Sequence, residues 1–138
     1  MLTITLWHHP TCSKSRAAAD LLRSLGVGVA LRDYLASPPT RDELQVMLAA
    51  LGLPPSQLAR RREPLFHELD LASATEDEIL EALVAHPSLL ERPIAVREDH
   101  GQLRATLGRP AARVLELVAP SMAHAPHVVE AIARRPPT

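Results

Sequence analysis

Aromatic side chains are scarce in this sequence. Trp7, Tyr34 and Phe66 are the only Trp, Tyr and Phe residues among 138, whereas proteins that bind single-stranded nucleic acid stack successive bases on such rings. The formal net charge is −1 with His counted as neutral, which gives no general attraction for polyanions. We therefore expect no nucleic-acid partner.

Long apolar runs are also missing. A helix that crosses a bilayer needs roughly 18 or more consecutive apolar residues, and no stretch of the sequence approaches that length. The first residues lack the pattern of a secretory signal peptide. We expect a cytoplasmic protein that does not associate with membranes.

Cysteine occurs once, at Cys12. A single thiol excludes an internal disulfide and any metal site built on a pair of thiolates. Neither a G-x-G-x-x-G element nor a P-loop occurs, so no bound nucleotide cofactor is expected. His124 and His127 stand three residues apart without a further ligand nearby, and we interpret them as part of a solvated face, not as a metal site. Any redox cycle must therefore take its second thiol from another molecule.

The first third of the chain predicts a βαβ unit. Residues 2–7 alternate apolar and polar side chains and predict a strand, and residues 28–35 predict a second one. Between them the apolar spacing becomes that of a helix over about 13–25, and Gly26 stands where this helix would end. The side chains expected to face inward are Ala18, Leu21, Leu22 and Leu25.

The remainder predicts helices, a hairpin and further helices. Two capping boxes each predict a helix start, and they are Thr40 with Glu43 and Thr75 with Glu78. Residues 92–96 and 102–107 flank a turn-rich segment and predict a β-hairpin. Pro110 suits the first position of the next helix, and a last helix is expected over about 121–133. The side chains expected to face inward after Pro110 are Ala111, Val114, Leu115 and Val118.

This order predicts an α/β fold with a mixed sheet flanked by helices. Parallel strands need a helical crossover, and a hairpin supplies an antiparallel edge. We expect one domain over residues 1–138, with a helical insertion at about 40–90 between the βαβ and ββα halves. A C-terminal helical tail is expected at about 119–138.

Cys12 lies where the first helix is expected to begin. The unpaired N–H groups at a helix start stabilise an anion, and Lys14, Arg16 and a protonated His8 would add positive potential. The alternative is a small core cysteine, but the neighbours Thr11, Ser13, Lys14 and Ser15 are all polar and make a poor core stretch. We predict a reactive thiolate.

Cys12 and Ser15 form a C-x-x-S element directly after a strand. This is the position of the C-x-x-C redox pair in thioredoxin/glutaredoxin-like folds, with serine in place of the second thiol. In that fold a proline that opens the third strand takes the cis form beside the active cysteine, and X-Pro is the peptide bond in which cis costs little. Pro93, after Arg92, is the candidate for that position, and Ser15 and Pro93 are expected to support the cysteine loop.

Five segments together resemble the glutaredoxin-coupled arsenate reductases: "HHPTCSKSR", "YLASPPTRDEL", "LARRREPLFHELDL", "HPSLLERPIAV" and "TLGRP". The likeness covers about residues 3–118. It implies a thioredoxin-like fold that reduces arsenate to arsenite with electrons from glutathione as co-substrate and from glutaredoxin as partner. It also implies Cys12 as the nucleophile and His8 as the histidine that favours its thiolate. The arginines that it implies for holding the oxyanion are Arg60, Arg92 and Arg109.

The sequence departs from this family at two positions near Cys12. His9 stands where the family commonly has asparagine, and Trp7 stands where it commonly has tyrosine. Arg61 and Arg62 adjoin Arg60 and offer alternatives for its role. Two other functions stay open: a glutathione-dependent thiol reductase of another substrate, and a non-enzymatic thioredoxin-fold regulator that binds RNA polymerase.

Overall fold

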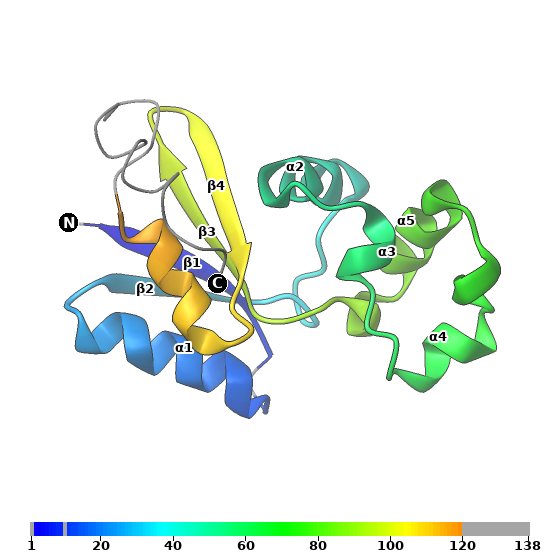
Figure 1. Cartoon of the computed structure of the whole chain (residues 1–138), viewed down its shortest axis with the longest axis horizontal. Helices are drawn as coiled ribbons and strands as arrows, with labels where there is room; N and C mark the ends of the chain where they lie inside the picture. The colour runs from blue at the N-terminus through cyan, green and yellow to red at the C-terminus, as the bar shows by residue number, and fades with distance from the viewer. Residues whose placement is uncertain (1, 10, 120–138) are drawn as a thin grey trace, which may run out of the picture.

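A four-stranded mixed sheet forms the centre of the protein. The computed structural model describes residues 2–9 and 11–119, and its strands are β1 (Thr3–His8), β2 (Gly28–Asp33), β3 (Ile94–Asp99) and β4 (Gln102–Leu107). Their order is β2-β1-β3-β4 (Figure 1). β1 and β2 are parallel, whereas β3 runs antiparallel to both β1 and β4. The expected parallel pair and antiparallel hairpin are both confirmed.

One face of the sheet is covered by α1 (Ser13–Ser24) and the 3-10 helix η3 (Ala111–Leu117), which lie side by side in front of the strands in Figure 1. Ile4 and Leu6 of β1 and Ala95 of β3 point toward this face and are fully buried. The residues that meet them from the two helices are Ala18, Ala19, Leu22, Val114 and Leu117.

The other face of the sheet packs against the segment between β2 and β3, which is helical. It contains α2 (Arg41–Leu51), α3 (Pro55–Leu58), α4 (Pro64–Glu68) and α5 (Glu76–Ala85), with short 3-10 turns η1 (Leu71–Ser73) and η2 (Pro87–Leu89). α2 lies beside β4, and α3, α4 and α5 gather beyond the sheet (Figure 1). Trp7 and Ile94 belong to the core of this side, because side chains alternate along a strand and these two face away from α1.

Both predicted capping boxes are present. The side chains of Thr40 and Thr75 each accept a hydrogen bond from the backbone N–H three residues later, and the carboxylates of Glu43 and Glu78 accept one from the backbone N–H of the threonine. Each box satisfies two N–H groups that the first turn of a helix leaves unpaired. These residues therefore fix where α2 and α5 begin.

The helix expected after Pro110 differs from the prediction. η3 is a 3-10 helix, which has three residues per turn, and its buried side chains are Val114 and Leu117. Leu115, expected to face inward, is 39% exposed. Ala111, Val114 and Val118 pack against the core as expected, but the expectation assumed the α-helical period and named Leu115 where Leu117 is buried.

Smaller corrections concern the ends of other elements. α1 ends at Ser24, and Leu25, expected inward, is 54% exposed because it lies past the last turn. β2 ends at Asp33 and β3 begins only at Ile94. The helix expected over 121–133 and most of the tail at 119–138 lie outside the described residues.

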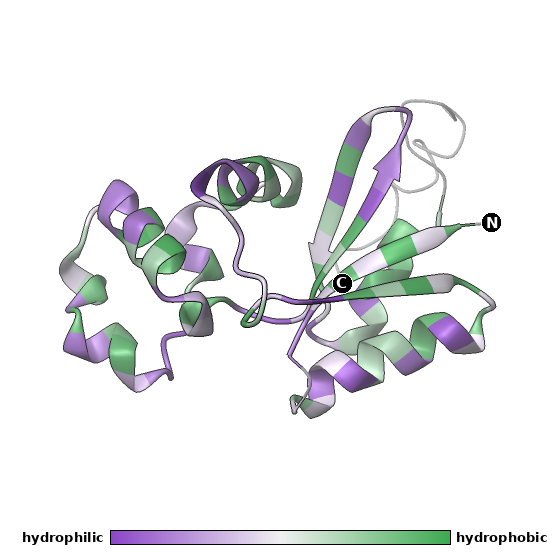
Figure 2. Cartoon of the chain, turned by 180° about the vertical axis from the view of Figure 1, so that it is seen from behind, coloured by the Kyte–Doolittle hydropathy of each residue, from purple (hydrophilic) through white to green (hydrophobic). Residues whose placement is uncertain are grey.

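The ribbon coloured by hydropathy shows how this arrangement follows from the sequence. In Figure 2 α1 and the strands mix hydrophobic and hydrophilic residues along their length, as expected of elements with one buried side. Within residues 2–9 and 11–119, no helix has the length and hydropathy needed to span a membrane.

Candidate functional site

The predicted site residues meet at one edge of the sheet. Trp7 pairs with Ile94, and Ile94 pairs with Leu107, so the end of β1, the start of β3 and the end of β4 lie at the same level. Cys12 follows β1, Arg92 precedes β3 and Arg109 follows β4. The strand register therefore brings together residues that are far apart in the sequence.

Cys12 is the N-cap residue of α1, as predicted, and its side chain is partly buried. Burial by itself raises the pKa of the thiol and is the largest single influence on it, whereas interaction with the Arg92 guanidinium lowers it. The nearby backbone N–H groups of Ser15 and Lys14 lower the pKa further, and so does the positive charge of Arg92. Together they lower the pKa of Cys12 from 9.0 to about 7. At neutral pH a large fraction of the thiol is therefore ionised.

Burial of His8 works against the positive charge that a protonated ring would add beside Cys12. The side chain of His8 is 8% exposed and its Nδ1 atom has no hydrogen-bond partner among the described residues. Burial lowers the pKa of His8, and the nearby charge of Asp33 opposes this only in part. His8 is therefore neutral at pH 7, and Arg92 is the cation that stabilises the Cys12 thiolate. A catalytic role for His8 stays a prediction.

The sequence predicted that Ser15 and Pro93 support the cysteine loop. Ser15 is fully buried, and its Oγ accepts a hydrogen bond of 3.4 Å from the N–H of His9. The Arg92-Pro93 peptide bond is cis, as predicted. Ser15 thus replaces a second thiol with a hydroxyl that closes the loop after β1.

Arg60 reaches the site through an isolated β-bridge between the helical segment and the chain before β3. Ala59 pairs with Leu90, the N–H of Arg60 donates to the carbonyl of Leu89 (2.7 Å), and the N–H of Glu91 donates to the carbonyl of Leu58 (2.8 Å). These two hydrogen bonds attach the Arg60 segment beside Arg92.

The Arg60 side chain is held by two oxygen atoms. Its Nη1 atom donates to Oε2 of Glu63 (3.1 Å) and to the carbonyl of Ser88 (3.2 Å). Its exposed neighbour Arg61 lies over the ring of Phe66, with 5.8 Å between the guanidinium carbon and the ring centroid. Arg60 is thus anchored close to the chain that carries Arg92.

Arg109 is positioned by a tight contact between two loops. The N–H of Gly108 donates to the carbonyl of Pro93 (2.9 Å), and a Cβ atom on Gly108 would come within 2.8 Å of the Pro93 ring. Only a residue without a side chain fits there, which explains the glycine in "TLGRP". The Arg109 side chain donates from Nη1 to Oε2 of Glu91 (3.0 Å).

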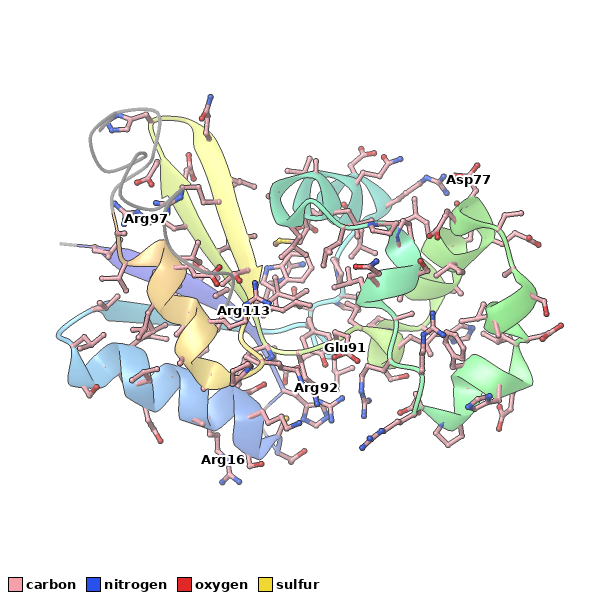
Figure 3. The ribbon with its side chains drawn as sticks, in the orientation of Figure 1. Arg16, Asp77, Glu91, Arg92, Arg97 and Arg113 are labelled. Carbon is pink, nitrogen blue, oxygen red and sulfur yellow. The ribbon has the colours of Figure 1, made fainter. Side chains whose placement is uncertain are left out.

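A cleft of about 930 Å³ opens over Cys12 and brings the predicted arginines together. Arg60, Arg92 and Arg109 all line it, as do Lys14, Arg61 and Arg62, and among the residues that the structure describes Glu91 is its one carboxylate. In Figure 3 Arg92 lies close to the first turn of α1, whereas the side chain of Arg16 points away from Arg92 into solvent. Such a cleft can hold an oxyanion next to a nucleophilic sulfur, because fixed cations offset the repulsion between the two negative charges.

Two residues near the thiolate were not singled out from the sequence. Tyr34 is 1% exposed, and its hydroxyl lies near Arg92 without a hydrogen-bond partner among the described residues. Glu91 faces the cations of the cleft. A tyrosine after a strand and a glutamate before an arginine carry no sequence signal for a place beside the thiolate or in the cleft. Only the folded structure reveals these positions. No cluster of three or more His, Cys, Asp or Glu side chains that could hold a metal occurs in the described part of the chain.

Comparison with known proteins fits this geometry. Residues 7–117 match the model of the ArsC family. The chain belongs to the ArsC family. An arsenate reductase of Rhizobium meliloti (strain 1021) from this comparison is 36% identical over 119 residues, which are 85% of this chain and 82% of the relative. The uncharacterized protein YfgD of Escherichia coli (strain K12) is 38% identical over 118 residues, 83% of this chain and 96% of that protein.

Solved structures of the family share the fold. The arsenate reductase from Vibrio cholerae superposes with a TM-score of 0.75 at 36% identity, and covers 83% of this chain and 97% of its own. A structure described as a putative arsenate reductase from Yersinia pestis gives a TM-score of 0.71 at 38% identity, with 82% and 98% covered. The thioredoxin-like fold expected from the sequence is confirmed.

Proposed function

We propose that this protein is an arsenate reductase whose nucleophile is Cys12. The observation that carries the proposal is a thiol whose pKa Arg92 helps to lower to about 7, in a cleft that Arg60, Arg92 and Arg109 all line. Arsenate is a tetrahedral anion, and a planar guanidinium can donate two parallel hydrogen bonds to its oxygens. The relatives named as arsenate reductases support this choice of substrate.

The reaction begins at the thiolate. Cys12 Sγ attacks arsenic, an S–As bond forms, and one arsenate oxygen takes up protons and leaves as water, with arsenic still in the +5 state. The arginines stabilise the charge on the remaining oxygens as this bond breaks. Glutathione then adds its sulfur to arsenic, and a second oxygen leaves as water.

The reduction needs two electrons, and we assign them to two external thiols. The thiol of glutaredoxin attacks the glutathione sulfur, a disulfide forms between them, and the electron pair of the broken S–As bond reduces arsenic to the +3 state. Water then cleaves the last S–As bond, which releases arsenite and restores Cys12. One cysteine suffices in this cycle, in agreement with the single thiol of the chain. The proposed donors operate in the cytoplasm, where thiols are kept reduced.

A coupled assay tests this function. Purified protein is mixed with arsenate, glutathione, glutaredoxin and an NADPH-linked system that reduces oxidised glutathione, and NADPH loss is followed. We expect arsenate-dependent turnover that Cys12→Ser abolishes, and Arg92→Gln is expected to lower turnover more than the solvent-facing control Arg16→Gln. Equal NADPH loss with wild type and Cys12→Ser would refute the proposal.

Two further arms of the assay identify the donor and the substrate class. Thioredoxin replaces glutathione and glutaredoxin in the first arm, and turnover there alone would overturn the proposed donors but not the reaction. A small organic disulfide replaces arsenate in the second. Cys12-dependent turnover with the disulfide and none with arsenate would instead favour a glutathione-dependent thiol reductase.

A further inference from the structure

Each arginine expected to hold the oxyanion already has an anionic partner in the structure. Arg60 is paired with Glu63, Arg92 with the Cys12 thiolate and Arg109 with Glu91. Of the two carboxylates, only Glu91 lines the cleft. Glu91 therefore lies where an incoming oxyanion would sit among the cations.

The backbone of Glu91 is fixed, whereas its carboxylate contact with Arg109 is not strong. The N–H of Glu91 donates to the carbonyl of Leu58, next to the bridge that joins the helical segment to β3. Its side chain is 23% exposed and meets Arg109 through a single contact between Oε2 and Nη1 at 3.0 Å. Ion pairs that reach solvent contribute little to stability, so an incoming anion can displace Glu91 from Arg109. Figure 3 shows Glu91 beside Arg92 on the segment that leads into β3.

We propose that Glu91 acts as a built-in competitor anion that weakens the reversible binding of tetrahedral oxyanions in the cleft. This inference rests on the proposed function for its purpose, because it concerns the same site. An anion that enters the cleft meets the negative charge of Glu91 and must also take Arg109 from it. Both effects lower the affinity for any tetrahedral anion of the same charge.

Weak reversible binding has a specific benefit in a site that works by covalent capture. Phosphate has the shape and charge of arsenate but does not form a bond with the thiolate, so it acts only by occupying the cations. Glu91 weakens this occupation for both anions, whereas arsenate retains the S–As bond as its own source of binding free energy. Glu91 thus limits the fraction of the protein that phosphate occupies at a given phosphate concentration.

The test measures anion binding without any turnover. Iodoacetamide alkylation of Cys12 is followed over a range of inorganic phosphate concentrations. For each variant we determine the phosphate concentration at which the alkylation rate falls to half of that variant's own rate without phosphate. Glu91→Gln keeps an oxygen that can accept from Arg109 and removes only the charge. We expect phosphate to protect this variant at about tenfold lower concentration than wild type.

Glu63→Gln is the matched control, because Glu63 pairs with Arg60 at a nearly equal distance (3.1 Å) but does not line the cleft. Its phosphate protection is expected to change by less than about threefold. An equal gain in both variants would overturn the cleft-specific role of Glu91. Weaker protection in Glu91→Gln would also overturn it, since Glu91 would then hold Arg109 in place for the anion. Glu91→Ala repeats the measurement if the glutamine variant does not fold.

Turnover separates this inference from the proposed function. In the coupled assay Glu91→Gln is expected to lower the KM for arsenate and the inhibition constant of phosphate, with kcat changed less than either. A merely structural role would instead lower the unfolding temperature and leave the inhibition constant unchanged. If wild type shows no arsenate turnover but the phosphate protection shifts as expected, the proposed function fails and the role of Glu91 stands.

Discussion

Arg92 is the main cation that ionises Cys12, and its removal should raise the pKa of the thiol. Arg92 lowers this pKa both through its side-chain N–H groups and through its charge, while the N–H groups of Ser15 and Lys14 remain when it is replaced. Burial of the thiol also remains, and it opposes ionisation. In Arg92→Gln we therefore expect the pKa of Cys12 to move from about 7 toward the ordinary 9.0.

The size of the effect follows from the ionised fraction. At pH 7 a thiol with a pKa of about 7 is about half ionised, whereas one with a pKa of 9.0 is about 1% ionised. A rise of one to two pKa units lowers the thiolate fraction at pH 7 by about fivefold to fiftyfold. Near pH 10 the thiolate predominates in both proteins, so the difference should nearly vanish there.

The assay is the pH dependence of iodoacetamide alkylation, which follows the thiolate. The midpoint of the profile gives the pKa directly, so a change in the intrinsic reactivity of the thiolate does not disturb the comparison. Arg16→Gln is the control, because Arg16 lies on α1, the helix that Cys12 caps, but its side chain points away from Arg92 (Figure 3). An unchanged midpoint in Arg92→Gln, or an equal shift in Arg16→Gln, would refute the reasoning.

Three further changes test other parts of the structure. Gly108→Ala places a Cβ atom 2.8 Å from the rigid ring of Pro93. We therefore expect the free energy of unfolding, measured by urea denaturation, to fall by about 1–3 kcal/mol. An unchanged denaturation midpoint would show that the two loops are not in contact. Tyr34→Phe removes a buried hydroxyl without a partner in the described residues. In the same experiment the free energy of unfolding should be unchanged or higher by up to about 1 kcal/mol. A clear loss of stability would reveal a hydrogen-bond partner of the hydroxyl. The pKa of Cys12 is lower in the folded state than its ordinary 9.0, so the thiolate contributes stability that is fully present above pH 9 and is lost as the pH falls through about 7. Wild type should therefore gain stability relative to Cys12→Ser between pH 7 and pH 9, and parallel curves would contradict the lowered pKa.

The sequence predicted the elements whose signals are local. The pairs Thr40 with Glu43 and Thr75 with Glu78 fixed two helix starts, because a capping box needs only residues three apart. The short element after Pro110 was predicted as an α-helix, because its apolar residues fit a period of 3.6 about as well as a period of three. Its packing against α1 and β4 decides between the two, and that packing is not local.

The site was predictable only in part for the same reason. Cys12 at a helix start and Pro93 before a strand carry local signals, and resemblance to a family indicated three arginines that the cleft does bring together. The charge state of His8 depends on burial by distant residues, which the sequence does not reveal. Glu91 resembles an ordinary surface glutamate until the bridge between Ala59 and Leu90 places it among the cations.

The bridge between Ala59 and Leu90 also bears on how such proteins diversify. It closes the base of the helical excursion, so insertions and deletions between the two residues alter the outline of that lobe without displacing Arg60 from Arg92. A chimera that exchanges only residues 61–88 should therefore keep the lowered pKa of Cys12, because Arg92, Ser15 and Lys14 all lie outside that segment.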